Sequence, residues 1–303
     1  MKRIFTFFFS LIFTTASFAQ IGGGWDWAYN TGSISHDTKY IGYNANGDML
    51  IVASTNAASY LGGTTVTVPD IAPNTPGQQS YLAKISATGT TTIIRSFLNP
   101  YFTFNVATTD AVGNFYVGMG YSAFGGVPIN LGNGVTLDGL TKAAIVKFSP
   151  TGVALWAKSF DLGVTHVPNI TANLEVLKIA FSAAGNIFFV AAANNLTSSP
   201  SRFSIIKLDG NGNTLWTRYS SVTLITQAAN YNKDKFIDND ENVYLAAYTS
   251  ATSIVFNGET VTAPSVTLDS PAYSFYMSLD GNGNKRWSNG FRGVISNLVV
   301  DKL

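Results

Sequence analysis

A turn-and-strand phrase returns four times along this chain. Its clearest copies are KLDGNGNTLWTRY at 207–219 and SLDGNGNKRW at 278–287, and the looser ones are KFSPTGVALWAKSF at 147–160 and KISATGTTTIIRSF at 84–97. Each copy is typical of two short β-strands joined by a turn rich in Asp, Asn and Gly. A phrase that recurs at roughly regular intervals is a structural repeat, so the fold must be built from copies of one unit.

A turn glycine precedes the last strand of every copy. These glycines are Gly89, Gly152, Gly212 and Gly283, and consecutive ones stand 63, 60 and 71 residues apart. Upstream of each lies another turn followed by an apolar strand. These segments are NANGDMLIVAS (44–54), DAVGNFYVGMG (110–120), SAAGNIFFVAA (182–192) and DNDENVYLAAY (238–248). Each repeat therefore predicts four strands, and the apolar second strands are typical of sheets covered on both faces.

A single four-stranded sheet cannot bury both of its faces, and packing such sheets face to face around an axis solves this problem. We therefore predict an all-β fold, a β-propeller of four-stranded antiparallel blades spanning residues 20–303. It would have four full repeats with partial ones at either end. Trp25–Gly32 matches the end of the repeat and Ser296–Val300 matches its beginning, so we expect an incomplete ring and a protein that continues past Leu303.

Tryptophan recurs at one position of the fourth strand. Trp156, Trp216 and Trp287 occupy it, and Ile93 takes it in the first repeat. A large flat side chain at a repeated position favours packing between adjacent sheets, where burial of the ring is worth a few kcal/mol, roughly 2–3. Stacking of an exposed tryptophan on a sugar is the alternative.

Three of the four connections between second and third strands predict an additional hairpin. SYLGGTTVTV (59–68), INLGNGVTL (129–137) and IVFNGETVTA (254–263) each place Gly-Gly or Asn-Gly between short β-forming segments. Elaborated loops on one face of a rigid scaffold are where binding usually resides. We therefore expect a ligand on the face that these hairpins build.

Residues 1–19 form a separate segment. Met1-Lys2-Arg3 is basic, Ile4–Phe18 is apolar, and Ser17-Phe18-Ala19 has the small-x-small pattern of a cleavage site. This pattern predicts a secretory signal peptide rather than a membrane anchor, because the apolar run is too short to span about 30 Å of hydrocarbon. We expect a secreted or cell-surface protein with no membrane span after cleavage.

These motifs resemble the secreted bacterial β-propeller repeat family, whose members carry a Gly-Asn-x-Tyr-Val second strand and an Asp-x-x-Gly-Asn turn before a tryptophan. Gly113–Val117, Asp209–Trp216 and Asp280–Trp287 carry the likeness. The resemblance implies an exported protein, often followed by a sorting domain for type IX secretion. The Gly-x-x-x-Trp spacing is also similar to quinoprotein propellers. Those often use an adjacent Cys pair, which this chain lacks, so we expect no cofactor.

The sequence predicts no catalytic or metal-binding residue. There are no cysteines, and the two histidines, His36 and His166, are assigned to connections between repeats, where solvated side chains are typical. Asp209-x-Asn211-x-Asn213 and its copy at Asp280 imitate the start of a calcium loop but equally suit a tight turn. The acidic cluster of Asp234, Asp238, Asp240 and Glu241 is interpreted as a solvated turn, with a weak cation site as the alternative.

Three functions stay open. The first is an extracellular binding or scaffold protein whose ligand is a polysaccharide or another surface protein. The second is a carbohydrate-active hydrolase or lyase, since propellers also host such enzymes. The third is a purely structural repeat array. The net charge of +1 and the 12% of charged residues give no footprint for nucleic acid.

Overall fold

The fold was analysed in a computed structural model that describes most of the chain between His36 and Arg292. The described ranges are 36–44, 46–55, 59–61, 64–66, 79–98, 102–121, 128–138, 142–160, 173–194, 202–221, 236–249, 252–263 and 273–292. The predicted signal peptide, Trp25–Gly32, His166, Asp234 and Ser296–Val300 lie outside these residues.

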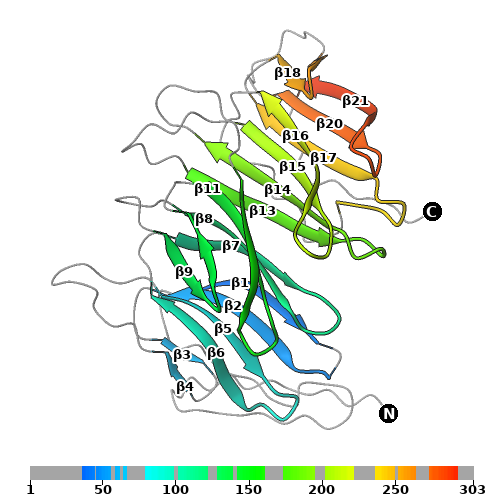
Figure 1. Cartoon of the computed structure of the whole chain (residues 1–303). Helices are drawn as coiled ribbons and strands as arrows, with labels where there is room; N and C mark the ends of the chain where they lie inside the picture. Colours follow the sequence, from blue (N-terminus) through cyan, green and yellow to red (C-terminus); the bar gives the residue numbers. More distant parts are fainter. Residues whose placement is uncertain are drawn as a thin grey trace, which may run out of the picture.

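The described residues form antiparallel sheets that repeat one plan (Figure 1). Sheet 1 contains β1 (His36–Tyr43), β2 (Met49–Thr55), β5 (Gln79–Ile85) and β6 (Thr91–Leu98). Sheet 2 contains β7 (Phe102–Thr109), β8 (Phe115–Tyr121), β11 (Lys142–Phe148) and β12 (Ala154–Phe160). Sheet 3 contains β13 (Asn173–Phe181), β14 (Ile187–Asn194), β15 (Arg202–Leu208) and β16 (Thr214–Ser221). Sheet 4 contains β17 (Val243–Thr249), β20 (Tyr273–Leu279) and β21 (Lys285–Arg292).

The all-β prediction is confirmed, and in sheets 1 to 3 the four predicted strands pair in sequence order. All four predicted second strands form, as β2, β8, β14 and β17. Sheet 4 has three strands among the described residues, and the segment before Phe236 lies outside them. The sheets follow one another in sequence order from the blue to the red end of Figure 1, and no closed propeller is detected in the part described. Within the same ranges no helix has the length and apolar character needed to cross a membrane.

Apolar side chains from facing sheets meet at what we call seams. The first seam, between sheets 1 and 2, buries residues such as Leu82 and Phe148, and the second, between sheets 2 and 3, buries Ile145 and Phe189. The third seam, between sheets 3 and 4, buries Phe188 and Phe275 among others. Each central sheet is therefore covered on both faces, which is why its inner strands are almost continuously apolar.

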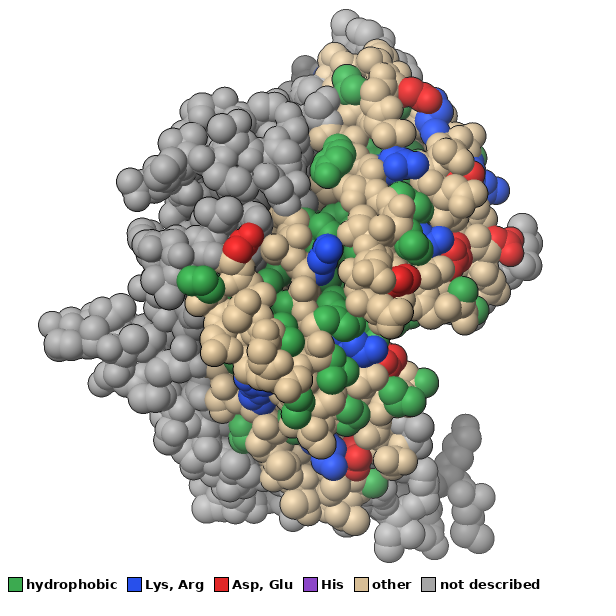
Figure 2. Space-filling view, in the orientation of Figure 1, with side chains coloured by type: hydrophobic (Ala, Val, Ile, Leu, Met, Phe, Trp, Pro, Cys, Tyr) green, Lys and Arg blue, Asp and Glu red, His purple; other side chains and the backbone are tan. Residues whose placement is uncertain are grey.

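The outer surface carries few charges. Figure 2 shows basic and acidic side chains spread over the described part of one face, some of them side by side, among hydrophobic and other atoms. This distribution agrees with the small share of charged residues in the sequence.

The three predicted hairpins are present. They are β3 (Ser59–Leu61) with β4 (Thr64–Val66), β9 (Ile129–Gly132) with β10 (Val135–Leu137), and β18 (Ser253–Phe256) with β19 (Glu259–Thr262). Asn133-Gly134 and Asn257-Gly258 all have positive φ, the backbone that a two-residue hairpin turn requires.

Two of the hairpins, β9–β10 and β18–β19, are built into the seams instead of standing free as loops. Leu131 and Leu137 of β9–β10 belong to the core of the first seam, while Ile254 and Phe256 of β18 belong to that of the third. β18 also pairs with β16 of the preceding sheet, through Ser220 opposite Phe256. One side of each of these two hairpins therefore contributes to stability, and only the other side faces solvent.

We predict that Phe256→Ala lowers the free energy of unfolding by about 3–5 kcal/mol, because it removes a buried ring that stacks on Phe203. The exposed Thr260→Ala in the same hairpin should change it by less than about 0.5 kcal/mol. Urea denaturation followed by circular dichroism measures both. Equal and small effects would show that the hairpin is not part of the core.

Candidate functional site

One five-residue turn recurs throughout the described residues. In each copy the first residue accepts a backbone hydrogen bond from the fourth and donates one to the carbonyl of the fifth, at 2.8–3.2 Å. The eight copies begin at Asn44, Ser86, Asp110, Ser149, Ser182, Asp209, Asp238 and Asp280. The turn therefore joins first to second strands and third to fourth strands alike, a likeness wider than the sequence phrase alone indicated.

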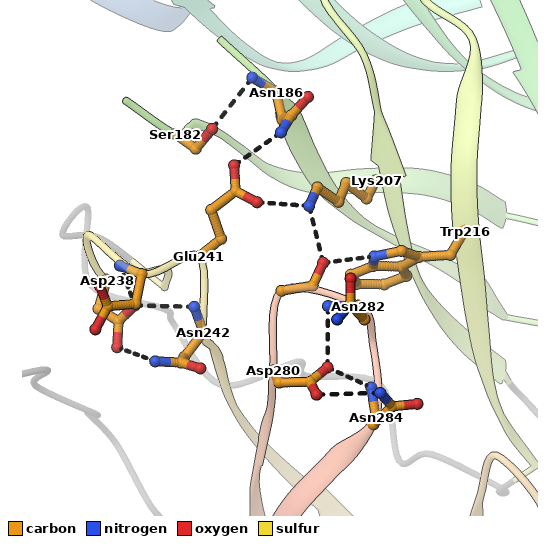
Figure 3. Close-up of polar contacts among 12 residues, drawn as sticks. Ser182, Asn186, Lys207, Trp216, Asp238, Glu241, Asn242, Asp280, Asn282 and Asn284 are labelled. Carbon is orange, nitrogen blue, oxygen red and sulfur yellow. Dashed lines mark hydrogen bonds and ion pairs between the residues drawn. The ribbon is translucent and has the colours of Figure 1, made fainter. Parts of the chain in front are cut away.

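The first side chain of the turn fixes its backbone. Asp280 Oδ1 accepts the backbone N–H groups of Asn282 and Asn284 at 2.9 and 2.8 Å, while its other oxygen accepts Asn284 Nδ2 at 3.1 Å (Figure 3). Asp209 makes the same three contacts with Asn211 and Asn213. These carboxylates act as turn acceptors, which is the turn interpretation of the calcium-like motif. No metal-binding group of three or more suitable side chains occurs in the described ranges.

The fourth residue of every turn has positive φ. Seven copies use glycine there, including the predicted Gly89, Gly152, Gly212 and Gly283, with φ between 77° and 85° in those four. The eighth copy uses Glu241, at 65°. Glycine adopts this backbone without a steric penalty, whereas other residues do so at a cost.

The predicted tryptophans lie against these glycines across the seams. A Cβ built on Gly212 would stand 3.0 Å from Trp156 Cδ2, and one on Gly283 would stand 3.0 Å from Trp216 Cδ2. Each ring belongs to the last strand of one sheet and each glycine to the turn of the next. Trp287, on the last described strand, is 40% exposed and contacts the rings of Tyr244 and Tyr276.

The assignment of Ile93 to the tryptophan position is wrong. Ile93 packs with Ile51 and Ala83 on the opposite face of sheet 1, and Ile94 is the residue that meets Gly152, 2.7 Å from a Cβ built there. The cause is a β-bulge. The register between the third and fourth strands shifts at Leu82/Ala83 in sheet 1, but next to the turn in the other sheets, as at Lys207/Leu208.

Arginines add polar contacts at two seams. Arg218 of β16 donates from Nε to the carbonyl of Gly283 at 2.7 Å and from Nη2 to that of Asn282 at 3.0 Å. Arg95 of β6 donates to the carbonyl of Gly152 at 2.8 Å and to that of Leu131 in the β9–β10 hairpin. The planar guanidinium groups thus bind backbone carbonyls of the neighbouring sheet and its hairpin.

The densest polar network lies in the third seam (Figure 3). Glu241 of the sheet 4 turn accepts Lys207 Nζ at 2.5 Å and Asn186 Nδ2 at 2.8 Å, both from sheet 3. Lys207 also donates to the carbonyl of Gly281 at 2.8 Å, and Trp216 Nε1 donates to the same oxygen at 3.0 Å. We call these residues, Asn186, Lys207, Trp216, Glu241 and Gly281, the Lys207 network.

Charge in this network follows from its contacts. Burial opposes ionisation of Glu241, but hydrogen bonds from Lys207, Ser182 and Asn186 and the lysine charge outweigh it, so the pKa of Glu241 lies below its ordinary value. Burial likewise opposes ionisation of Asp238, yet hydrogen bonds from Asn242 and Tyr244 keep its pKa below the usual range. In the second seam, burial raises the pKa of Tyr116, and Asp110, which accepts its hydroxyl, adds to the effect.

The prediction that the acidic cluster is a solvated turn therefore holds for only part of it. Asp238 and Asp240 sit in the turn, but Glu241 forms an ion pair whose side chains are 8% (Lys207) and 18% (Glu241) exposed. His36, assigned to a connection, begins strand β1. The repeated Lys at the start of the phrase, Lys84, Lys147 and Lys207, was the sequence signal that could have pointed to the network.

We predict that Gly212→Ala destabilises the protein by about 1–3 kcal/mol more than Gly185→Ala. Both glycines have φ near 80°, but a Cβ at Gly212 meets Trp156 while one at Gly185 has no heavy atom within 4 Å. The difference isolates the ring contact from the backbone penalty. Matched urea melts of the two variants measure it, and equal losses would contradict the contact.

We predict that Glu241→Gln lowers stability at pH 7 by about 1–3 kcal/mol, because it leaves the buried ammonium of Lys207 without a charged partner. The pKa of Glu241 is depressed in the fold, so its contribution is complete above its ordinary value of 4.5 and is lost as pH falls below that. The difference in the free energy of unfolding between wild type and variant should therefore become smaller in acid.

The exposed pair Lys285–Glu259 supplies the control, since both side chains are more than a third exposed. Glu259→Gln should change stability by less than about 1 kcal/mol. Chemical denaturation at pH 7 and at pH 3.5 compares the two variants. If the difference in unfolding free energy between wild type and Glu241→Gln stays the same at both pH values, the ionised carboxylate does not stabilise the seam.

Glu241, Arg95, Arg218, Trp156 and Trp216 join one sheet to the next, whereas Asp209 and Asp280 hold their own turns. No protein-family model matches the chain, and a search of curated proteins finds no relative.

Proposed function

We propose that the protein is an exported β-propeller that acts outside the cell as a binding scaffold for polysaccharide. The observation that carries the proposal is the repetition of one seam. Three successive sheets each present a side chain of their last strand to the positive-φ turn of the next, so the stack is held rigidly and its connections can vary. The four sheets would be consecutive blades.

The hairpins supply the surface for the ligand. In β9–β10 and β18–β19 apolar side chains are buried in the seams, and the exposed side chains include Asn130, Thr136, Thr260 and Thr262. Side-chain amides and hydroxyls donate and accept hydrogen bonds, which suits the hydroxyl groups of a sugar chain. Export rests on the predicted signal peptide at residues 1–19.

The described acidic residues support a scaffold more than a hydrolase. Asp110, Asp209, Asp238 and Asp280 accept the hydrogen bonds of their own turns, and Glu241 holds Lys207. A glycosidase needs a pair of carboxylates directed at the scissile bond. The carboxylates that form these contacts are instead directed at backbone N–H groups and at neighbouring side chains.

We predict that the secreted protein binds at least one extracellular polysaccharide in a glycan screen. A Thr260→Ala/Thr262→Ala variant should weaken that binding about threefold or more, with little change in melting temperature, because both hydroxyls are exposed. If no glycan in a broad screen binds the protein, the proposal is wrong. Turnover of a polysaccharide that one carboxylate substitution abolishes would show that the protein is an enzyme instead.

A further inference from the structure

One lysine position is repeated in three sheets, and its ammonium has a different partner in each. Lys84, Lys147 and Lys207 stand at the same place in the third strand, paired with Leu50, Tyr116 and Phe188 of the second. Their counterpart in sheet 4 is Ser278, opposite Tyr244. All three lysines lie on the side of their sheet that faces the next one.

Two of these lysines have a carboxylate partner. Lys84 Nζ lies 3.5 Å from Asp48, the fifth residue of a turn in its own sheet. Lys207 Nζ lies 2.5 Å from Glu241, the fourth residue of a turn in the next sheet. A repeat can therefore supply the anion from either of two positions, and each of these seams uses one.

In the second seam neither of these two positions carries a carboxylate. The position of Asp48 is held there by Asn114, whose amide donates to Asp110, and the position of Glu241 is held by Gly185. Lys147 Nζ lies over the ring of Tyr116, 5.0 Å from its centroid, and no described carboxylate comes within ion-pair distance of it. The indole N–H of Trp156 in the same seam also has no acceptor, whereas its counterpart Trp216 has one.

The place that a carboxylate would occupy is open. Gly185 is exposed, and a Cβ built on it has no heavy atom within 4 Å. In the third seam that same position bears Glu241, whose carboxylate bridges Lys207 and Asn186. The molecule therefore contains both a filled version and an open version of one carboxylate-binding arrangement.

We propose that the open arrangement, formed by Lys147, Gly185 and the neighbouring Tyr116 and Trp156, binds the carboxylate of an acidic sugar of the uronic acid class. The carboxylate follows from the comparison of the two seams, because an ammonium beside an open, exposed position favours an anion of the type that Glu241 provides. The sugar follows from the proposed function, on which this part rests. Tyr116, 3% exposed, lies beneath the ammonium and Trp156 lies against Gly212, so the contact offered to the ligand is the ammonium of Lys147.

The test is calorimetric titration of the full-length secreted protein with an oligogalacturonate. Lys147→Gln should weaken binding about tenfold or more, since it removes a charge-assisted contact. Lys147→Arg should restore most of the affinity. Lys285→Gln, which removes one exposed positive charge in sheet 4, should leave it unchanged.

A second variant fills the site from within. Gly185→Glu places a carboxylate where Glu241 stands in the third seam, at a φ of 81° against 65° for Glu241. It should abolish oligogalacturonate binding while Lys147 is intact, and a melting curve establishes that the variant folds. If Gly185→Glu fails to fold, the Lys147→Gln variant still tests the proposal.

Three results would overturn the proposal. They are unchanged affinity in Lys147→Gln, equal binding of the methyl-esterified oligosaccharide, and binding of acetate as tight as that of the oligosaccharide, which would remove the sugar assignment. Binding of neutral glycans that survives Lys147→Gln would leave the proposed function standing while refuting this site. The failures of the two proposals are thus distinguishable.

Discussion

The positive φ at the fourth residue of each turn is the constraint on which the stacking of the sheets depends. A glycine there lets the chain reverse within five residues, and its missing Cβ lets the indole of Trp156 or Trp216 lie directly against the next sheet's backbone. That approach brings the turn carbonyls within reach of donors across the third seam, where Trp216, Lys207 and Arg218 use them. Local backbone geometry and contact between sheets therefore come from the same residue.

Each repeat of the seam places a lysine at the same position, and the charge of that lysine must be accommodated each time. Lys207, whose side chain is 8% exposed, loses hydration and needs a partner within reach, whereas Lys84, at 39%, keeps much of its water. Asp48 supplies the compensation within one sheet, Glu241 supplies it from the next, and the face of Tyr116 supplies a weaker version at Lys147.

The sequence predicted what depends on local pattern and missed what depends on contacts between repeats. Strands β2, β8, β14 and β17 and the three hairpins follow from alternation and turn residues, which neighbours in sequence decide. The exchange of Ile93 for Ile94 arises from a bulge whose place is set by cross-strand register. Lys207 and Glu241 lie 34 residues apart in the sequence and in different sheets, and composition does not indicate that two such residues pair. The burial of the hairpins was equally invisible, because their apolar residues are ordinary for any strand.

Glu241 shows how a departure from the repeat is stabilised. A non-glycine residue in the left-handed region costs about 1–2 kcal/mol, which argues against glutamate at this position on local grounds. Against that cost stand hydrogen bonds from the ammonium of Lys207 and the amide of Asn186, and contacts to charged groups contribute about 1.5–3 kcal/mol each. The balance favours glutamate only where a lysine of the preceding sheet waits without another anion. Lys207 of sheet 3 is such a lysine, whereas Lys84 of sheet 1 already pairs with Asp48 and has Gly113 at the corresponding turn position. Lys147 of sheet 2 also has no described carboxylate partner, but Gly185 occupies the turn position there and leaves it open.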